Sequence, residues 1–168
     1  MAASNDFKPA PGRREIKDLA VSLITEQTTM TLATADKNKA WAAPVYYVFL
    51  QSAFYFLSDP KSRHIQESLQ SGQASASIHA AASTWKEIRG LQMTGCVLPV
   101  EVGREALQAL GAYLKKYPFT REFFGQNTRL DLTSFKDRFG VRLYKFRPAL
   151  AYYLDNQIRF AFREEVKL

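Results

Sequence analysis

A short polar segment contains four consecutive side chains that could bind an anion. Lys61, Ser62, Arg63 and His64 follow an apolar run that ends in an Asp-Pro turn. If a helix begins here, the N–H groups of its first turn are unpaired and its dipole favours a negative charge. The guanidinium and hydroxyl groups would add hydrogen bonds that suit a phosphate. The segment by itself leaves two interpretations open: a phosphate site, or a capped helix start whose cations face water.

Residue types that often carry catalysis or bind metals are few in this sequence. Its single cysteine is Cys96, and its two histidines, His64 and His79, have no cysteine or carboxylate at ligand spacing. A zinc site is therefore not expected. There is no Ser-His-Asp or paired-carboxylate signature, and no Walker or G-x-G-x-x-G glycine pattern. Cys96 is expected to be a buried apolar residue, and a lone cysteine favours a reducing compartment, the cytoplasm.

Length and composition are typical of one globular domain. The 168 residues are 46% hydrophobic, 23% charged and 13% aromatic, which suits a single sizeable core. No apolar run reaches the roughly 20 residues that a membrane helix needs, and the N-terminus has no apolar signal-peptide region. The net charge of +7 favours anionic ligands, but the basic residues are scattered. We therefore expect neither a membrane nor a nucleic-acid partner.

Hydrophobic periodicity predicts a mixture of helices and strands. Residues 1–14 are expected to form a flexible N-terminal tail, followed by one domain over residues 15–168. Amphipathic helices are predicted over residues 15–26 and 104–117, and a short helix follows the Asp-Pro turn. Alternating, β-branched and aromatic segments predict strands over residues 28–35, 40–50, 53–58, 73–80, 85–102, 140–156 and 157–162.

Proline and glycine positions refine this prediction. Pro44 cannot donate to a strand ladder, so it marks an edge strand, a bulge or a position beside another group. Gly90 and Gly95 interrupt a long strand as the bend of a barrel strand would. Short polar turns are expected at "DKNK" and "QS". The predicted fold class is α+β and mainly antiparallel, with six or so strands forming a small barrel with flanking helices.

Several of these motifs, in this order, resemble a known superfamily. The series "MTLATADKNKAWAAPVYYV", "AFYFLSDPKSRHIQ", "ASASI" and "EIRGLQMTG" is similar to the flavin-binding split-barrel proteins that include pyridoxamine 5'-phosphate oxidase. Within that superfamily, "IRGLQMTG" and "LYKFRPALAYYLDN" are most similar to the YhbP-like group. The resemblance covers residues 28–100 and 140–156. It implies a six-stranded split β-barrel, a homodimer, and one FMN in each of two clefts at the dimer interface.

The resemblance also implies which residues contact FMN. One group matches the phosphate segment, a second matches the strand that lies along the isoalloxazine ring, and one residue matches a position that reaches the flavin of the partner subunit. His64 stands where lysine or arginine is usual, which predicts weaker or pH-dependent phosphate binding. The phosphate group comprises Ser58, Ser62, Arg63 and His64, the ring strand comprises Ala42, Ala43, Pro44 and Val45, and the last position is Gln92.

The function that this resemblance implies is FMN-dependent oxidation or reduction of a small molecule, with hydride passing between flavin N5 and a substrate or NAD(P)H. No catalytic residue is assigned. Pyridoxamine-phosphate oxidation itself is not expected, because the terminal "REEVKL" matches that enzyme's C-terminal arginines poorly. Two alternatives stay open: a non-enzymatic flavin or haem-type ligand binder on the same fold, and a basic nucleic-acid-binding barrel that uses its aromatic residues for stacking.

Overall fold

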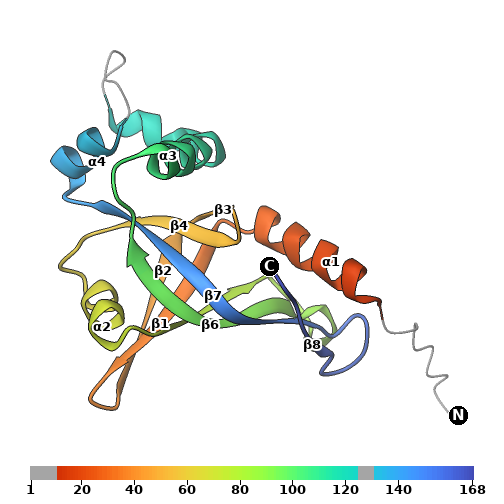
Figure 1. Cartoon of the computed structure of the whole chain (residues 1–168). Coiled ribbons are helices and arrows are strands. Elements are labelled where there is room, and N and C mark those ends of the chain that lie inside the picture. The colour runs from red at the N-terminus through yellow and green to blue at the C-terminus, as the bar shows by residue number, and fades with distance from the viewer. Residues whose placement is uncertain (1–10, 125–130) are drawn as a thin grey trace, which may run out of the picture.

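The computed structural model describes residues 11–124 and 131–168, in which helices flank one curled sheet (Figure 1). The N-terminal helix begins two residues earlier than predicted, at Arg13. Residues 1–10 of the predicted flexible tail lie outside the described residues. The α-helices of the described part are α1 (Arg13–Glu26), α2 (Arg63–Ser71), α3 (Arg104–Lys116) and α4 (Leu132–Phe139), and 3₁₀ segments cover Trp85–Glu87 and Pro118–Phe123.

The strands of the described residues form one antiparallel sheet, in the order β2-β1-β5-β6-β7-β4-β3 with β8 paired to β7. The predicted α+β class with a mainly antiparallel sheet is confirmed, although the sheet has eight strands rather than about six. Figure 1 shows the sheet curling into a half-barrel. The strands are β1 (Thr29–Asp36), β2 (Lys39–Tyr46), β3 (Val48–Leu50), β4 (Ala53–Ser58), β5 (Ala74–His79), β6 (Arg89–Pro99), β7 (Arg142–Asp155) and β8 (Arg163–Glu165).

The strand predicted over residues 40–50 is divided in two, because Tyr47 leaves the ladder between β2 and β3. Its carbonyl oxygen lies 2.5 Å from the hydroxyl of Tyr117, which also lies 3.2 Å from its backbone nitrogen. Its own hydroxyl donates to the carbonyl of Ile24 at 2.8 Å. A buried tyrosine that follows α3 thus takes the place of a neighbouring strand, and it ties β2 and β3 to the helices.

The strand predicted over residues 85–102 is observed only over Arg89–Pro99, and of the interruptions predicted at Gly90 and Gly95 only the one at Gly95 is found. Its register with β7 shifts between Thr94 and Gly95. A Cβ atom on Gly95 would lie 2.0 Å from the carbonyl oxygen of Arg147, so no side chain fits there. The bulge bends the long strand so that the sheet can curl.

The prediction of a strand over residues 157–162 is wrong, because this segment forms a loop. Hydrogen bonds to polar side chains stabilise the loop. The Asp155 carboxylate accepts the N–H of Gln157 at 2.8 Å, and the Asn156 amide oxygen accepts the N–H of Ala161 at 3.0 Å. Ala161 has a positive φ of 58°. Such side-chain bonds compete with a strand ladder. Pairing with β7 begins only after this loop, at β8.

Both predicted polar turns are confirmed, and each consists of two residues. Lys37 and Asn38 join β1 to β2, and Gln51 and Ser52 join β3 to β4. All four residues have positive φ values, between 46° and 66°. This geometry matches the right-handed twist of the strands that the turns connect.

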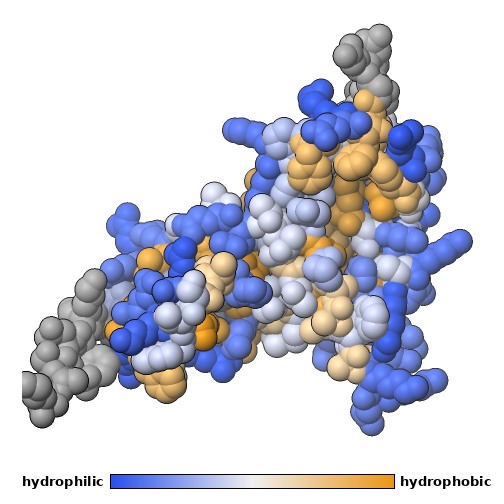
Figure 2. All heavy atoms as spheres, turned by 180° about the vertical axis from the view of Figure 1, so that it is seen from behind, coloured by the Kyte–Doolittle hydropathy of each residue, from blue (hydrophilic) through white to orange (hydrophobic). Residues whose placement is uncertain are grey.

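Two apolar clusters lie on either side of β4. Phe54 and Phe56 belong to the larger cluster, which fills the half-barrel beside α1 and includes Phe146. Tyr55 points the other way and packs in the smaller cluster beneath α3, together with Tyr113. Alternation along a strand produces this division. On the face that Figure 2 shows, apolar side chains gather in patches among hydrophilic ones. No helix of the described residues is long and apolar enough to cross a membrane.

Candidate functional site

Three of the four residues predicted to bind phosphate come together at the start of α2. Ser58, the last residue of β4, has its Oγ 2.8 Å from Nε2 of His64 and 3.2 Å from Oγ of Ser62. Oγ of Ser62 lies 3.3 Å from the same imidazole nitrogen. We call Ser58, Ser62 and His64 the hydroxyl–imidazole group. It is part-buried, and only 8% of Ser58 is exposed.

The side chains beside the start of α2 do not cap its first turn. Ser62 occupies the N-cap position, but its side chain makes no capping hydrogen bond. Asp59 instead forms the preceding turn, where its carboxylate accepts the N–H of Lys61 at 2.8 Å. A polar side chain at the N-cap normally occupies one of the free N–H groups of the first turn. Neither side chain therefore caps α2, but Lys61 and Arg63 are exposed, as the interpretation of a solvated helix start expects.

His64 is held mainly in its neutral form. Burial lowers its pKa below the ordinary value of 6.5, and the negative charge of Glu67 opposes this only in part. A neutral imidazole can accept one hydroxyl proton or donate one of its own. The hydroxyl–imidazole group therefore offers hydrogen bonds to an anion without a permanent positive charge.

Arg63 points away from this group, toward the hairpin of β1 and β2. Its Nε donates to the carboxylate of Glu67 at 2.5 Å, and Nη2 donates to the carbonyl of Lys39 at 3.3 Å. Its guanidinium carbon also lies 4.8 Å from the ring centre of Trp41. In this arrangement the predicted phosphate-binding arginine is occupied by contacts within the chain.

Glu67 is a residue of this region that sequence reasoning missed. It is only 7% exposed, and its second carboxylate oxygen accepts the hydroxyl of Thr34 at 2.6 Å. The hydrogen bond from Thr34, followed by that from Arg63, lowers the pKa of Glu67, so it is ionised at neutral pH. The spacing of Arg63 and Glu67, four residues apart at a helix start, is the signal that could have found the pair.

The predicted ring strand is β2, which lies at one edge of the sheet and pairs only with β1. Of the three alternatives for Pro44, the edge strand is the one observed, and Pro44 lies opposite Thr31. Ala43 and Val45 are buried and face the core, whereas Ala42 and Pro44 are exposed on the other face. The four positions therefore do not present their side chains to one ligand, although the second edge of β2 has no paired strand among the described residues.

Gln92 shares the outer face of the sheet with Pro44. The strand register places Pro44 opposite Thr31, Thr31 opposite Ser77, and Ser77 opposite Gln92. At about 4.8 Å between strands, Gln92 lies roughly 14 Å from Pro44 along this row. It is therefore separated, within one chain, from both the ring strand and the hydroxyl–imidazole group.

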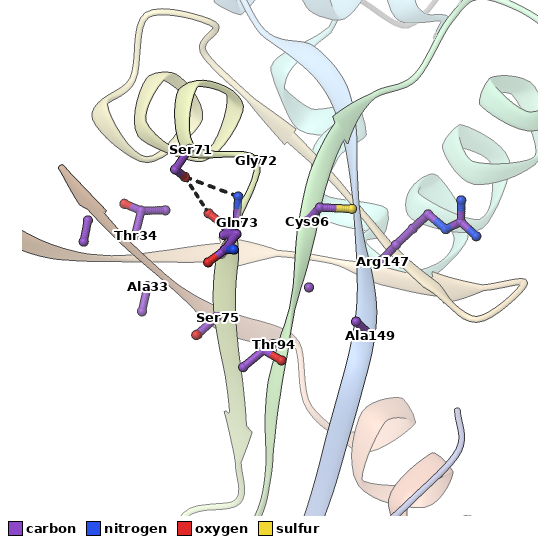
Figure 3. A pocket seen from close by; sticks show the side chains of 13 residues that line it. Ala33, Thr34, Ser71, Gly72, Gln73, Ser75, Thr94, Cys96, Arg147 and Ala149 are labelled. Carbon is purple, nitrogen blue, oxygen red and sulfur yellow. Dashed lines mark hydrogen bonds between the residues drawn. The ribbon is translucent and has the colours of Figure 1, made fainter.

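The outer face is hollowed by two adjoining cavities of about 740 and 320 Å³. Both cavities are lined by Ala33, Ser75 and Thr94, which have small side chains (Figure 3). Gln92 lines the smaller cavity. The larger cavity reaches the C-terminal end of α2, at the opposite end of this helix from the hydroxyl–imidazole group. We call this surface the outer-face groove.

Two further residues considered from the sequence are Cys96 and His79. Cys96 is half-buried rather than fully buried, and it lines the larger cavity. His79 is exposed, and its Nδ1 lies 3.3 Å from the carbonyl oxygen of Ala80. Among the described residues, no group of three or more histidine, cysteine or acidic side chains could hold a metal ion.

Comparison with solved structures defines the fold class. The heme binding protein from Mycobacterium smegmatis matches 95% of this chain with a TM-score of 0.67 at 15% identity, and the chain spans 60% of that protein. A putative pyridoxamine 5'-phosphate oxidase from Listeria innocua matches 83% of the chain and 98% of its own, with a TM-score of 0.61 at 10% identity. An FAD-binding protein from Mesorhizobium loti matches 79% of the chain and 89% of its own, at 12% identity and a TM-score of 0.59. The chain thus shares the split-barrel fold of these proteins, as its motifs indicated.

Sequence comparison then identifies the family. No protein-family model matches the chain. The UPF0306 protein YhbP of Salmonella schwarzengrund is 30% identical over 135 residues, which cover 76% of this chain and 91% of that protein. The chain belongs to this YhbP-like UPF0306 family, which confirms the group that the sequence motifs resembled.

Proposed function

We propose that this protein binds FMN and acts as a split-barrel oxidoreductase on a small molecule. The observation that carries the proposal is the hydroxyl–imidazole group beside the uncapped start of α2. Hydroxyl, imidazole and helix N–H groups are the donors that a phosphate needs, and the helix dipole favours its charge. Ser58, Ser62 and His64 would hold the phosphate of FMN, with Arg63 as a fourth donor.

The rest of FMN would lie between two copies of the chain. The free edge of β2, from Ala42 to Val45, offers backbone groups that no neighbouring strand uses. Gln92 is too far from β2 in the same chain, so it would reach a flavin held by the second copy of a homodimer. The small side chains of the outer-face groove would let another copy approach closely. The mass of the protein in solution, measured by light scattering, tests this dimer.

Bound FMN would supply hydride transfer at its N5 atom, with a small substrate or NAD(P)H as the other reactant. The contribution of the chain is to hold the phosphate, align the ring along β2 and exclude water from it. No side chain is assigned a proton-transfer role.

A haem-type ligand is the second candidate, because the Mycobacterium smegmatis protein of similar fold is a heme binding protein. Its iron would take an axial nitrogen from His64 or His79, the two histidines of the sequence. Nε2 of His64 is already within hydrogen-bond distance of two hydroxyls, and His79 lies exposed at the end of β5. Neither arrangement favours iron over the phosphate of a flavin, so FMN is the preferred ligand.

A titration followed by absorption and fluorescence tests this choice. Purified protein is expected to quench FMN fluorescence on binding and to bind riboflavin, which lacks the phosphate, at least about tenfold more weakly. NADPH added without oxygen should then bleach the bound flavin. A Soret band on adding hemin, together with no FMN binding even in large excess, would instead establish the haem-type alternative.

FMN affinity is expected to depend on pH through His64. Burial keeps the pKa of His64 low in the free protein, whereas a phosphate dianion beside it would raise that pKa. Binding therefore takes up a proton, and affinity should increase as the pH falls through the bound-state pKa of His64 toward its lower free-state pKa, by up to about tenfold for each unit by which these two pKa values differ. In the protein without FMN, the lowered pKa of His64 also affects stability. The contribution of neutral His64 to the free energy of unfolding is fully present above pH 6.5 and is lost as the pH falls through the folded-state pKa.

His64→Lys is the matched variant for this pH dependence. Its permanent charge should make FMN affinity higher and nearly constant over the same pH range. Equal pH profiles for the wild type and His64→Lys would show that another group is responsible and would remove His64 from the phosphate site.

A further inference from the structure

The side chain of Arg63 is 42% exposed, but it contacts Trp41, Glu67 and the carbonyl of Lys39. One face of the guanidinium covers Trp41, one nitrogen donates to Glu67, and another donates to the carbonyl of Lys39. Glu67 is itself fixed by the hydroxyl of Thr34 on β1. These contacts belong to α2 and to the β1–β2 hairpin, and none of them involves the hydroxyl–imidazole group.

Adjacent residues of a helix point in directions about 100° apart, so Arg63 and His64 face different sides of α2. His64 faces Ser58 at the end of β4, whereas Arg63 faces Trp41 on β2. The long side chain of Arg63 can change this direction by rotation about its own bonds, without movement of the helix. The guanidinium can therefore have two partners, the buried carboxylate of Glu67 or an anion at the start of α2.

We propose that Glu67 and Trp41 form a latch that holds Arg63 away from the anion site, and that a phosphate group competes with the carboxylate of Glu67 for the guanidinium. This inference rests on the proposed binding of FMN and adds its regulation. The carboxylate of Glu67 accepts only Nε–H of Arg63, and it holds the guanidinium over Trp41, so the guanidinium must leave this position to reach a phosphate beside His64. The latch lowers the affinity for FMN by the free energy needed to release Arg63.

Glu67→Gln tests the latch, because glutamine keeps the shape and can still accept the hydroxyl of Thr34. FMN should bind this variant about 3- to 10-fold more tightly than the wild type, as expected when a competing ion pair is removed. Riboflavin should show no such gain, because it has no phosphate. Glu26→Gln is the matched control: it also removes one carboxylate from an ion pair, the one with Arg89, and should leave FMN affinity unchanged.

A double-mutant cycle separates the latch from simple charge repulsion. If Glu67 acts through Arg63, the gain from Glu67→Gln disappears when Arg63 is already alanine. If the gain persists without Arg63, or if Glu67→Gln binds FMN no more tightly than the wild type, the latch is disproved.

The Nε–H resonance of Arg63 gives a second readout in the wild type, which needs no variant to fold. It should shift when FMN is added, and an unchanged resonance in protein that binds FMN would also disprove the latch. If neither the wild type nor Glu67→Gln binds FMN in large excess, the proposed function itself is wrong.

Discussion

Arg63→Ala is expected to weaken FMN binding by about 1.5–3 kcal/mol, or about 10- to 150-fold, because a charged hydrogen bond to the phosphate is lost. In the free protein Arg63 contacts Glu67, Trp41 and the carbonyl of Lys39, so the variant also removes these contacts. The loss should be confined to ligands that carry a phosphate. Fluorescence titrations with FMN and riboflavin measure both affinities, and thermal unfolding measures the accompanying change in stability.

Arg89→Ala is the matched control for this variant. Arg89 also forms an ion pair, with Glu26 at 2.7 Å, and its removal changes the net charge by the same amount. Its contacts lie between α1 and β6, so FMN affinity should stay within about twofold of the wild type. Equal affinities for the wild type and Arg63→Ala would exclude Arg63 from the site, and equal losses in both variants would indicate a general effect of charge.

Phe146→Ala is expected to lower the free energy of unfolding by about 3–5 kcal/mol. Phe146 lies on β7 between Phe54 of β4 and Val97 of β6, and it is completely buried in the larger cluster. Removing its ring leaves a cavity where three strands meet, and the curled sheet cannot close over it without breaking its register. For a chain of this size the midpoint of thermal unfolding should fall by roughly 10 °C.

Phe160→Ala provides the comparison, since it removes the same ring from the surface. Phe160 is 69% exposed and contacts Trp85 edge-on, with the ring centres 5.4 Å apart. Its replacement should change the free energy of unfolding by no more than about 0.5–1 kcal/mol. Similar losses for both variants, in calorimetry or urea unfolding, would contradict the position of the larger cluster as the main core.

Local sequence patterns predicted the elements of the fold well where a segment's own residues decide its structure. The apolar face of the N-terminal helix, the two polar turns and the irregularity at Gly95 all follow from side-chain type and spacing. The patterns failed where distant or polar partners decide. Tyr117 divides one long predicted strand in two, and the side chains of Asp155 and Asn156 convert another into a loop.

For the candidate site, the sequence by itself determined the cluster of anion-binding residue types and the family, but not whether the start of α2 is capped. Only the tertiary structure decided how they are used. Ser58 reaches His64 because β4 and α2 meet there, whereas Arg63 turns to Trp41 and Glu67 because the β1–β2 hairpin lies on the other side of the helix. The physical reason is that neighbouring residues of a helix face different directions. What each of them contacts therefore depends on elements that are distant in the sequence.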